Sequence, residues 1–182
     1  MSSGASATWW DGKCQLEIAA AVTDEEPDWA EVSNVRALIV DGTQVVLARS
    51  REGVLHLPGG RLEPREVPQA ALARELREEL GITSHLAERI GRIRFRHLTP
   101  KPHDYPYPFP VFEQVVYLVT APSFDASHQI EDDWIADVIR MLMSQLEEAD
   151  LPPTHRVFID WLAMRQTSSI TPAVESLEPI KE

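Results

Sequence analysis

The stretch that decides the fold is GRLEPREVPQAALARELREELGI, residues 60–82, which places five glutamates and four arginines close together. Three of these glutamates, Glu75, Glu78 and Glu79, crowd one short segment. Like charges at helical spacing repel one another by roughly 0.2–0.5 kcal/mol per pair. The segment therefore predicts either a solvated acidic face or a surface that carries a bound cation.

Residues 68–80 within this stretch have the features of a helix. Pro68 suits the first turn of a helix, and Gly81 suits the position just after the last turn. An apolar stripe recurs every four residues and consists of Leu72, Leu76 and Leu80. The three clustered glutamates lie at i, i+3 and i+4 and share a different face. We therefore expect the leucines to anchor the helix while the carboxylates point into a cleft.

A cluster of carboxylates of this kind suits Mg²⁺ or Mn²⁺, which prefer hard oxygen ligands. The sequence Pro58-Gly59-Gly60 lies before the predicted helix and permits unusual backbone geometry. A backbone carbonyl there could therefore join the carboxylates on the same ion. From the three glutamates alone, a solvated face is the alternative.

The complete spacing is more specific than the glutamates alone. Its fixed positions are Gly60, Glu66, Arg74-Glu75-Leu76, Glu78-Glu79 and Gly81-Ile82. This pattern resembles the Nudix box of the Nudix hydrolases at every defining position. The resemblance implies an α/β/α sandwich with a mixed central sheet, in which the box forms a loop, a helix and a loop. It also implies hydrolysis of a pyrophosphate linkage in a nucleoside diphosphate joined to another moiety, with Mg²⁺ or Mn²⁺ as cofactor.

The same resemblance implies roles for the residues of the box. The expected metal ligands are Glu75, Glu78 and Glu79, together with the Gly60 carbonyl. One glutamate can instead act as the catalytic base, and the candidates are Glu75 and Glu79. We expect Glu66 and Arg74 to form a salt bridge that fixes the loop against the helix.

Acidic residues outside the box are further candidates for a ligand or base. Glu131, Asp132 and Asp133 lie before a late strand, in a region from which Nudix enzymes often draw such a group. A solvated acidic turn is the alternative for these three. Glu113 shares one face of a predicted strand with Val111, Val115 and Tyr117 and could face the same cleft.

The loop TPKPHDYPYPFP, residues 99–110, is rich in proline and aromatic residues. A base or sugar could stack on its rings, a contact that contributes on the order of 1–3 kcal/mol. The candidates are His103, Tyr105, Tyr107 and Phe109. Arg49, Arg51 and Arg61 lie near the box and could bind phosphate oxygens. The alternatives are a rigid connection and ordinary surface arginines.

The rest of the chain predicts one mixed α/β domain. Two β-branched runs flank Asp41-Gly42 and indicate a hairpin over residues 35–50. Further strands are expected over residues 88–98, 111–121 and the run after Trp134, followed by a helix over 153–166. We divide the chain into an extension (1–30) with one strand near 15–22, the Nudix domain (31–166) and a polar tail (167–182).

Charge and composition limit the partners. The net charge of −12 argues against a nucleic-acid polymer or an anionic membrane. The small diphosphate substrate that the resemblance implies would need a local positive charge to approach, and a bound divalent metal would supply it. The single cysteine and the absence of a membrane-spanning apolar run make the cytoplasm the expected location. The oligomeric state is left open, and a homodimer formed through residues 1–30 is one alternative. The other functions considered are a non-catalytic Nudix-like nucleotide-binding or regulatory module and an isoprenoid diphosphate isomerase, but the intact box argues against both.

Overall fold

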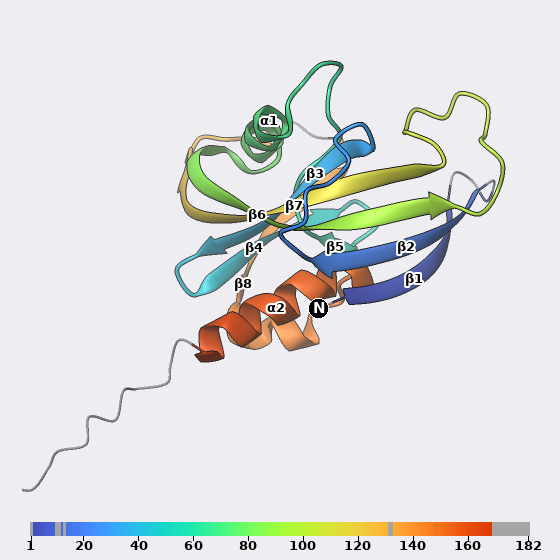
Figure 1. Cartoon of the computed structure of the whole chain (residues 1–182). Coiled ribbons are helices and arrows are strands. Elements are labelled where there is room, and N and C mark those ends of the chain that lie inside the picture. Colours follow the sequence, from blue (N-terminus) through green and yellow to red (C-terminus); the bar gives the residue numbers. More distant parts are fainter. Residues whose placement is uncertain (1, 10–11, 13, 131–132, 169–182) are drawn as a thin grey trace, which may run out of the picture.

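The computed structural model describes residues 2–9, 12, 14–130 and 133–168. Within this part of the chain, one mixed sheet runs in the order β1-β2-β6-β7-β3-β4-β5, and β8 also pairs with β4 (Figure 1). The pairing of β3 with β7 is parallel, and the other pairings are antiparallel. The strands are β1 (Ser2–Trp9), β2 (Cys14–Val22), β3 (Val32–Asp41), β4 (Gln44–Ser50), β5 (Leu55–His56), β6 (Ile82–His97), β7 (Val111–Phe124) and β8 (Ile135–Leu142).

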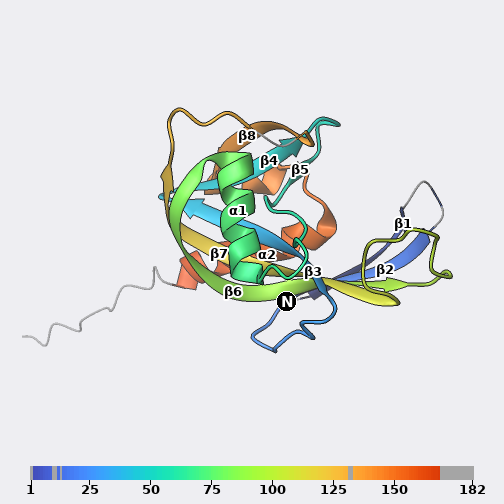
Figure 2. The ribbon, with the colours of Figure 1, turned by 90° about the horizontal axis from the view of Figure 1, so that it is seen from above.

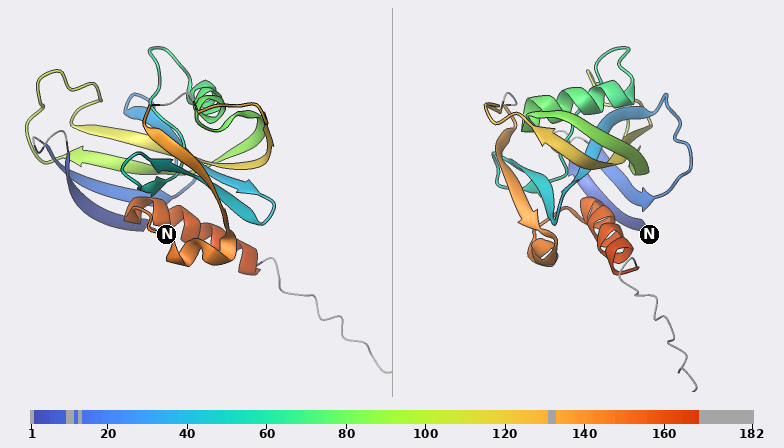
Figure 3. Two further views of the ribbon diagram at one scale, coloured as in Figure 1. Left: turned by 180° about the vertical axis from the view of Figure 1, so that it is seen from behind. Right: turned by 90° about the vertical axis from the view of Figure 1, so that its left-hand side faces the viewer.

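Helices cover both faces of this sheet. Helix α1 (Pro68–Leu80) packs on one face, and α2 (Pro153–Ser168) lies with the short 3₁₀ helix η1 (Met143–Glu148) on the other face (Figures 1 and 3). Two large apolar cores correspond to these faces. Val35, Ala37 and Val115 pack with the leucines of α1, whereas Leu38 and Val116 pack with α2. The expected α/β/α sandwich with a mixed central sheet is confirmed.

The local signals of the sequence agree closely with these elements. Helix α1 begins at Pro68 and ends at Leu80, as predicted. Gly81 adopts a left-handed φ of 67° and donates its N–H to the carbonyls of Arg77 and Leu76. The predicted hairpin is the pair β3–β4, and Gly42 in its turn has a φ of 60°. Left-handed backbone of this kind is accessible to glycine at little steric cost.

The N-terminal region is more ordered than its composition suggests. The strand expected near residues 15–22 is present as β2, which pairs with β6. A further strand, β1, was not expected; it pairs with β2 and extends the sheet at its edge (Figure 2). Residues 2–9 and 14–22 are therefore part of the same sheet on which the box helix α1 packs. The division at residues 30 and 166 and a homodimer through residues 1–30 stay predictions, and most of the tail lies outside the described residues.

Among the helices that the structure describes, none combines the length and the apolar character needed to cross a membrane.

Candidate functional site

The carboxylates of helix α1 are largely buried. The exposed fractions of Glu75 and Glu79 are 7% and 3%, whereas the Glu78 side chain is 35% exposed. The leucine stripe of the same helix is buried against the sheet. The helix therefore cannot rotate about its axis to expose these glutamates without also exposing the leucines. Charged side chains are seldom buried without partners. The arrangement thus calls for compensating groups close to Glu75 and Glu79.

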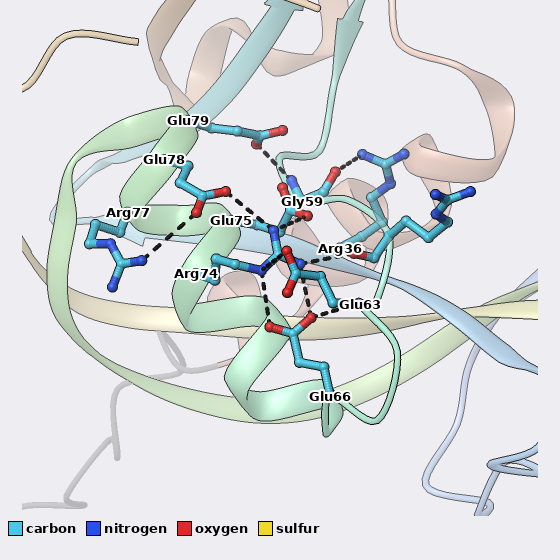
Figure 4. A network of polar contacts seen from close by, with 10 residues as sticks. Arg36, Gly59, Glu63, Glu66, Arg74, Glu75, Arg77, Glu78 and Glu79 are labelled. Atoms are coloured by element: carbon cyan, nitrogen blue, oxygen red, sulfur yellow. Dashed lines mark hydrogen bonds and ion pairs between the residues drawn. The ribbon is translucent and has the colours of Figure 1, made fainter. Parts of the chain in front are cut away.

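The backbone of Gly59 and Gly60 supplies part of that compensation. Gly59 donates its N–H to Oε2 of Glu79 at 2.8 Å (Figure 4). A side chain at position 60 would collide with Glu75, because a Cβ atom there would lie 2.5 Å from Cδ and 2.6 Å from Oε2. Gly59 has a φ of 120°, and a Cβ atom on it would meet the Val35 carbonyl. Gly60 therefore allows the backbone to approach the Glu75 carboxylate, and Gly59 allows it to approach β3.

Arg74 connects the carboxylates of α1 with the preceding loop. Its guanidinium lies 2.9 Å from Oε2 of Glu66, 2.9 Å from Oε1 of Glu75 and 3.2 Å from Oε2 of Glu78 (Figure 4). It also donates to the carbonyl of Arg61 at 2.9 Å. The hydrogen bond from Arg74 lowers the pKa of Glu66, and the reciprocal interactions raise the pKa of Arg74. The predicted Glu66–Arg74 salt bridge is present, and Arg74 additionally holds two of the expected metal ligands.

The donor set suits a hard divalent cation. Three carboxylates project from one helix, and the Gly60 carbonyl, which accepts a hydrogen bond from Val35 N–H at 2.9 Å, retains a second lone pair. In the described part of the chain, no three acidic, His or Cys side chains converge on a single point, since Glu75 and Glu78 are turned toward Arg74. The donor chemistry fits the metal, provided that these carboxylates turn away from Arg74.

A pocket of about 410 Å³ opens beside the glycine segment. Two of the candidate substrate residues line it, and the guanidinium of Arg61 lies 5.9 Å from the ring centre of Tyr107. The pocket is lined by Asn34, Arg36, His56, Gly59, Gly60, Arg61, Glu79, Tyr107, Trp134 and Ile135. A second cavity of about 450 Å³, which includes Trp29 and the box loop, also reaches Arg61. Arg61 therefore stands between two spaces that could each receive part of a ligand.

Other residues from the proline-rich loop do not line this pocket. Tyr105 is buried at 6% exposure, packs against Phe112 and lies 2.7 Å from the ring of His97. Its ring is thus part of the core, which corrects the expectation that it faces a ligand. His103 is exposed and paired with Asp104 at 2.6 Å. Phe109 is 40% exposed and contacts His97.

The remaining charged candidates are engaged in pairs elsewhere. Arg49 lies 3.9 Å from Asp137, and Arg51 lies 3.5 Å from Asp133, which is fully exposed. None of these lines the pocket around Arg61. Glu131 and Asp132 lie outside the described residues. A ligand or base from this region stays a prediction.

Glu113 is fully buried, but it faces arginines of the neighbouring strand. Its Oε1 lies 2.9 Å from Arg94 and 3.7 Å from Arg92. Burial raises the pKa of Glu113, and the two arginines oppose that shift. Its Oε2 has no hydrogen-bond partner in the described part of the chain. Glu113 therefore forms internal ion pairs with these arginines, and it does not line the pocket beside the box.

Sequence reasoning missed several residues of the pocket. Asn34 and Arg36 lie on β3, His56 lies on β5, and Trp134 directly precedes β8. Trp134 is 66% exposed despite its size. These residues are far apart in the sequence, and only the packing of β3, β5 and β8 around β4 brings them together. A polar residue such as Arg36 within an apolar strand was the one local signal.

The comparisons with known proteins agree with the geometry. A family model described as NUDIX domain matches residues 31–162. The chain is 39% identical over 61 residues to an 8-oxo-dGTP diphosphatase of Haemophilus influenzae, a match that covers 31% of this chain and 45% of that relative. The matched region thus spans less than half of the length of this curated relative.

Solved structures share the fold at lower identity. The pyrophosphohydrolase BsRppH of Bacillus subtilis is 14% identical with a TM-score of 0.56, and the match covers 92% of this chain and 99% of that chain. The dihydroneopterin triphosphate pyrophosphohydrolase of E. coli is 15% identical with a TM-score of 0.55, covering 74% and 96%. Since the family model spans most of the chain and includes the whole box, this chain belongs to the Nudix hydrolase family.

Proposed function

We propose that this protein hydrolyses a pyrophosphate linkage in a nucleoside diphosphate joined to another moiety, with Mg²⁺ or Mn²⁺ as cofactor. Glu75, Glu78 and Glu79 would hold the metal, with the Gly60 carbonyl as an additional ligand. The observation that carries the proposal is the buried carboxylate face of α1, against which the Gly59–Gly60 backbone is packed at the edge of an open pocket.

The bound metal would neutralise phosphate oxygens and lower the pKa of a water molecule. The chain itself supplies the other requirements of phosphoryl transfer, which are mainly positioning and charge stabilisation. One of these glutamates, Glu75 or Glu79, would instead act as the base and accept the proton of the attacking water. Arg61, at the junction of the two cavities, would bind phosphate oxygens through its guanidinium.

Recognition of the attached groups falls to the walls of the pocket. Tyr107 and Trp134 offer aromatic surface on which a base can stack. The second cavity, next to Trp29, provides room for the moiety on the other side of the phosphates. The substrate is thus a small molecule, and the lone cysteine is consistent with a reducing compartment such as the cytoplasm.

A substrate panel tests this proposal. Nucleoside triphosphates, nucleotide sugars, ADP-ribose and dinucleoside polyphosphates are incubated with the protein and Mg²⁺, and the products are separated by ion-exchange chromatography. We expect cleavage of at least one class at the pyrophosphate, and Glu78→Gln should lose most of the turnover. If the protein bound these compounds but cleaved none of them, the result would favour a non-catalytic nucleotide-binding module over a hydrolase.

A further inference from the structure

We propose that Arg36 is a positioning residue for Glu79, a carboxylate of the box, although Arg36 lies on a strand outside the box. Arg36 would act through the backbone of residues 57–60, which it binds from the side opposite to Glu79 (Figure 4). This inference rests on the proposed function, because it assigns Arg36 a task in preparing the metal site. It adds a residue that the box pattern does not contain.

The carbonyls of residues 57–60 are bound alternately by backbone and side chain. The Pro58 carbonyl accepts from Ala37 N–H at 2.8 Å, and the Gly60 carbonyl accepts from Val35 N–H at 2.9 Å. The carbonyls of Leu57 and Gly59 alternate with these two along the segment. Arg36 donates to both of them from Nη1, and the Leu57 carbonyl also lies 3.2 Å from Nδ1 of His56.

The peptide unit that contacts Glu79 lies between the two units that Arg36 holds. Gly59 N–H belongs to the Pro58–Gly59 peptide, and this N–H is the donor to Oε2 of Glu79. Arg36 binds the carbonyl of the preceding unit and that of the following unit. Gly59 also has a φ of 120°, a conformation that glycine adopts at little steric cost and other residues rarely adopt. Arg36 therefore restrains the backbone on both sides of the N–H that orients Glu79.

Arg36 is itself held in place by the sheet. Its Nε donates to the amide oxygen of Gln114 on β7 at 3.2 Å. It alternates with Ala37, which packs toward α1, and shares its face with Leu38, which packs toward α2. On this face, His155 of α2 accepts the N–H of Leu57 at 3.2 Å. The segment is thus clamped between α1 on one side and Arg36 with His155 on the other.

The test compares Arg36→Met with a matched control, Arg156→Met. Arg156 also donates to two carbonyls, those of Leu146 and Ala149, but it lies on α2 away from the box. Two quantities are measured in each full-length variant. The first is the amide hydrogen exchange rate of Gly59 in metal-free protein, relative to core amides of β7, by NMR. The second is the affinity for Mn²⁺ by electron paramagnetic resonance.

We expect both variants to lower the Tm, because each leaves carbonyls without their donor. Only Arg36→Met should accelerate exchange of the Gly59 amide relative to β7, by about tenfold, and weaken Mn²⁺ binding by about tenfold, as loss of a supporting residue around a metal site typically does. Arg36→Lys keeps the charge but not the planar guanidinium, and should give intermediate values. It also serves in place of Arg36→Met if that variant does not fold.

Equal Gly59 exchange in Arg36→Met and in the parent would overturn the proposal, and so would equal effects of Arg36→Met and Arg156→Met on Mn²⁺ affinity. The exchange measurement requires neither metal nor substrate. If the parent protein itself fails to bind Mn²⁺, the proposed function is wrong, and the exchange rate of Gly59 alone then decides whether Arg36 positions the segment.

Discussion

Replacement of Gly60 by alanine should create its closest steric conflict with the carboxylate of Glu75. The added Cβ would lie 2.5 Å from Cδ of Glu75, whereas ordinary contacts begin at 3.4 Å, so the carboxylate must move by roughly 1 Å. Glu75 is 2.9 Å from Arg74, and a shift of this size is enough to break that hydrogen bond. A hydrogen bond between charged groups contributes about 1.5–3 kcal/mol.

The expected net effect is smaller, because alanine restricts the unfolded chain more than glycine does, and this restriction stabilises the folded state by about 0.4–1 kcal/mol. We therefore expect Gly60→Ala to lower the free energy of unfolding by about 1–2 kcal/mol. In a Glu75→Ala background the obstacle is absent, and the same substitution should have no destabilising effect. The coupling between the two positions should then be about 2 kcal/mol.

Urea unfolding in metal-free buffer, followed by tryptophan fluorescence, measures these differences. Gly4→Ala is the control, because a Cβ at Gly4 meets only the Ile18 carbonyl at 3.9 Å, an ordinary contact. It should leave the protein as stable as the parent, or slightly more stable. If Gly60→Ala destabilises the parent and the Glu75→Ala variant equally, the reasoning that Gly60 makes room for Glu75 is refuted.

Arg74→Ala should lower the free energy of unfolding by about 2–3 kcal/mol and also reduce turnover, because it removes the contacts that hold both the loop at Glu66 and the carboxylates of the helix. A free energy of unfolding and a turnover equal to those of the parent would contradict this. Tyr107→Ala should raise KM more than it lowers kcat, while His103→Ala, outside the pocket, should change neither; steady-state kinetics decide this. Burial holds the pKa of His155 well below 6.5, so the unfolded chain binds a proton that the folded chain excludes. The contribution of neutral His155 to the free energy of unfolding should therefore be complete above pH 6.5 and decrease as the pH drops below that value. The urea midpoint should decrease less between pH 7.5 and 5.5 in His155→Gln than in the parent.

The box and its helix could be predicted from the sequence because their determinants are local. Pro68 and Gly81 fix the ends of α1, and the spacing of the leucines fixes which face is buried. The salt bridge between Glu66 and Arg74 joins residues only eight positions apart. Fixed spacing along one short segment was sufficient for each of these features.

The pocket could not be predicted, since it depends on contacts between distant strands. Arg36 reaches the glycine segment only because β3 and residues 57–60 lie side by side, and Trp134 reaches it through β8. Tyr105 and Tyr107 look equivalent in the proline-rich loop, but Tyr105 is buried with Cys14 and Phe112, whereas Tyr107, which also stacks on Phe112, reaches the pocket. Strand β1 was missed because its small residues carry little strand signal, and pairing with β2 supplies the stabilisation.

The central claim is that the carboxylates of α1 support hydrolysis by holding a divalent cation. The most direct measurement is the turnover of the best substrate from the panel, before and after EDTA treatment and then after addition of Mg²⁺ or Mn²⁺. We predict that EDTA abolishes hydrolysis, that either metal restores it in the parent, and that neither restores it in Glu78→Gln. Full turnover in metal-free buffer, or a Glu78→Gln variant as active as the parent, would contradict the account.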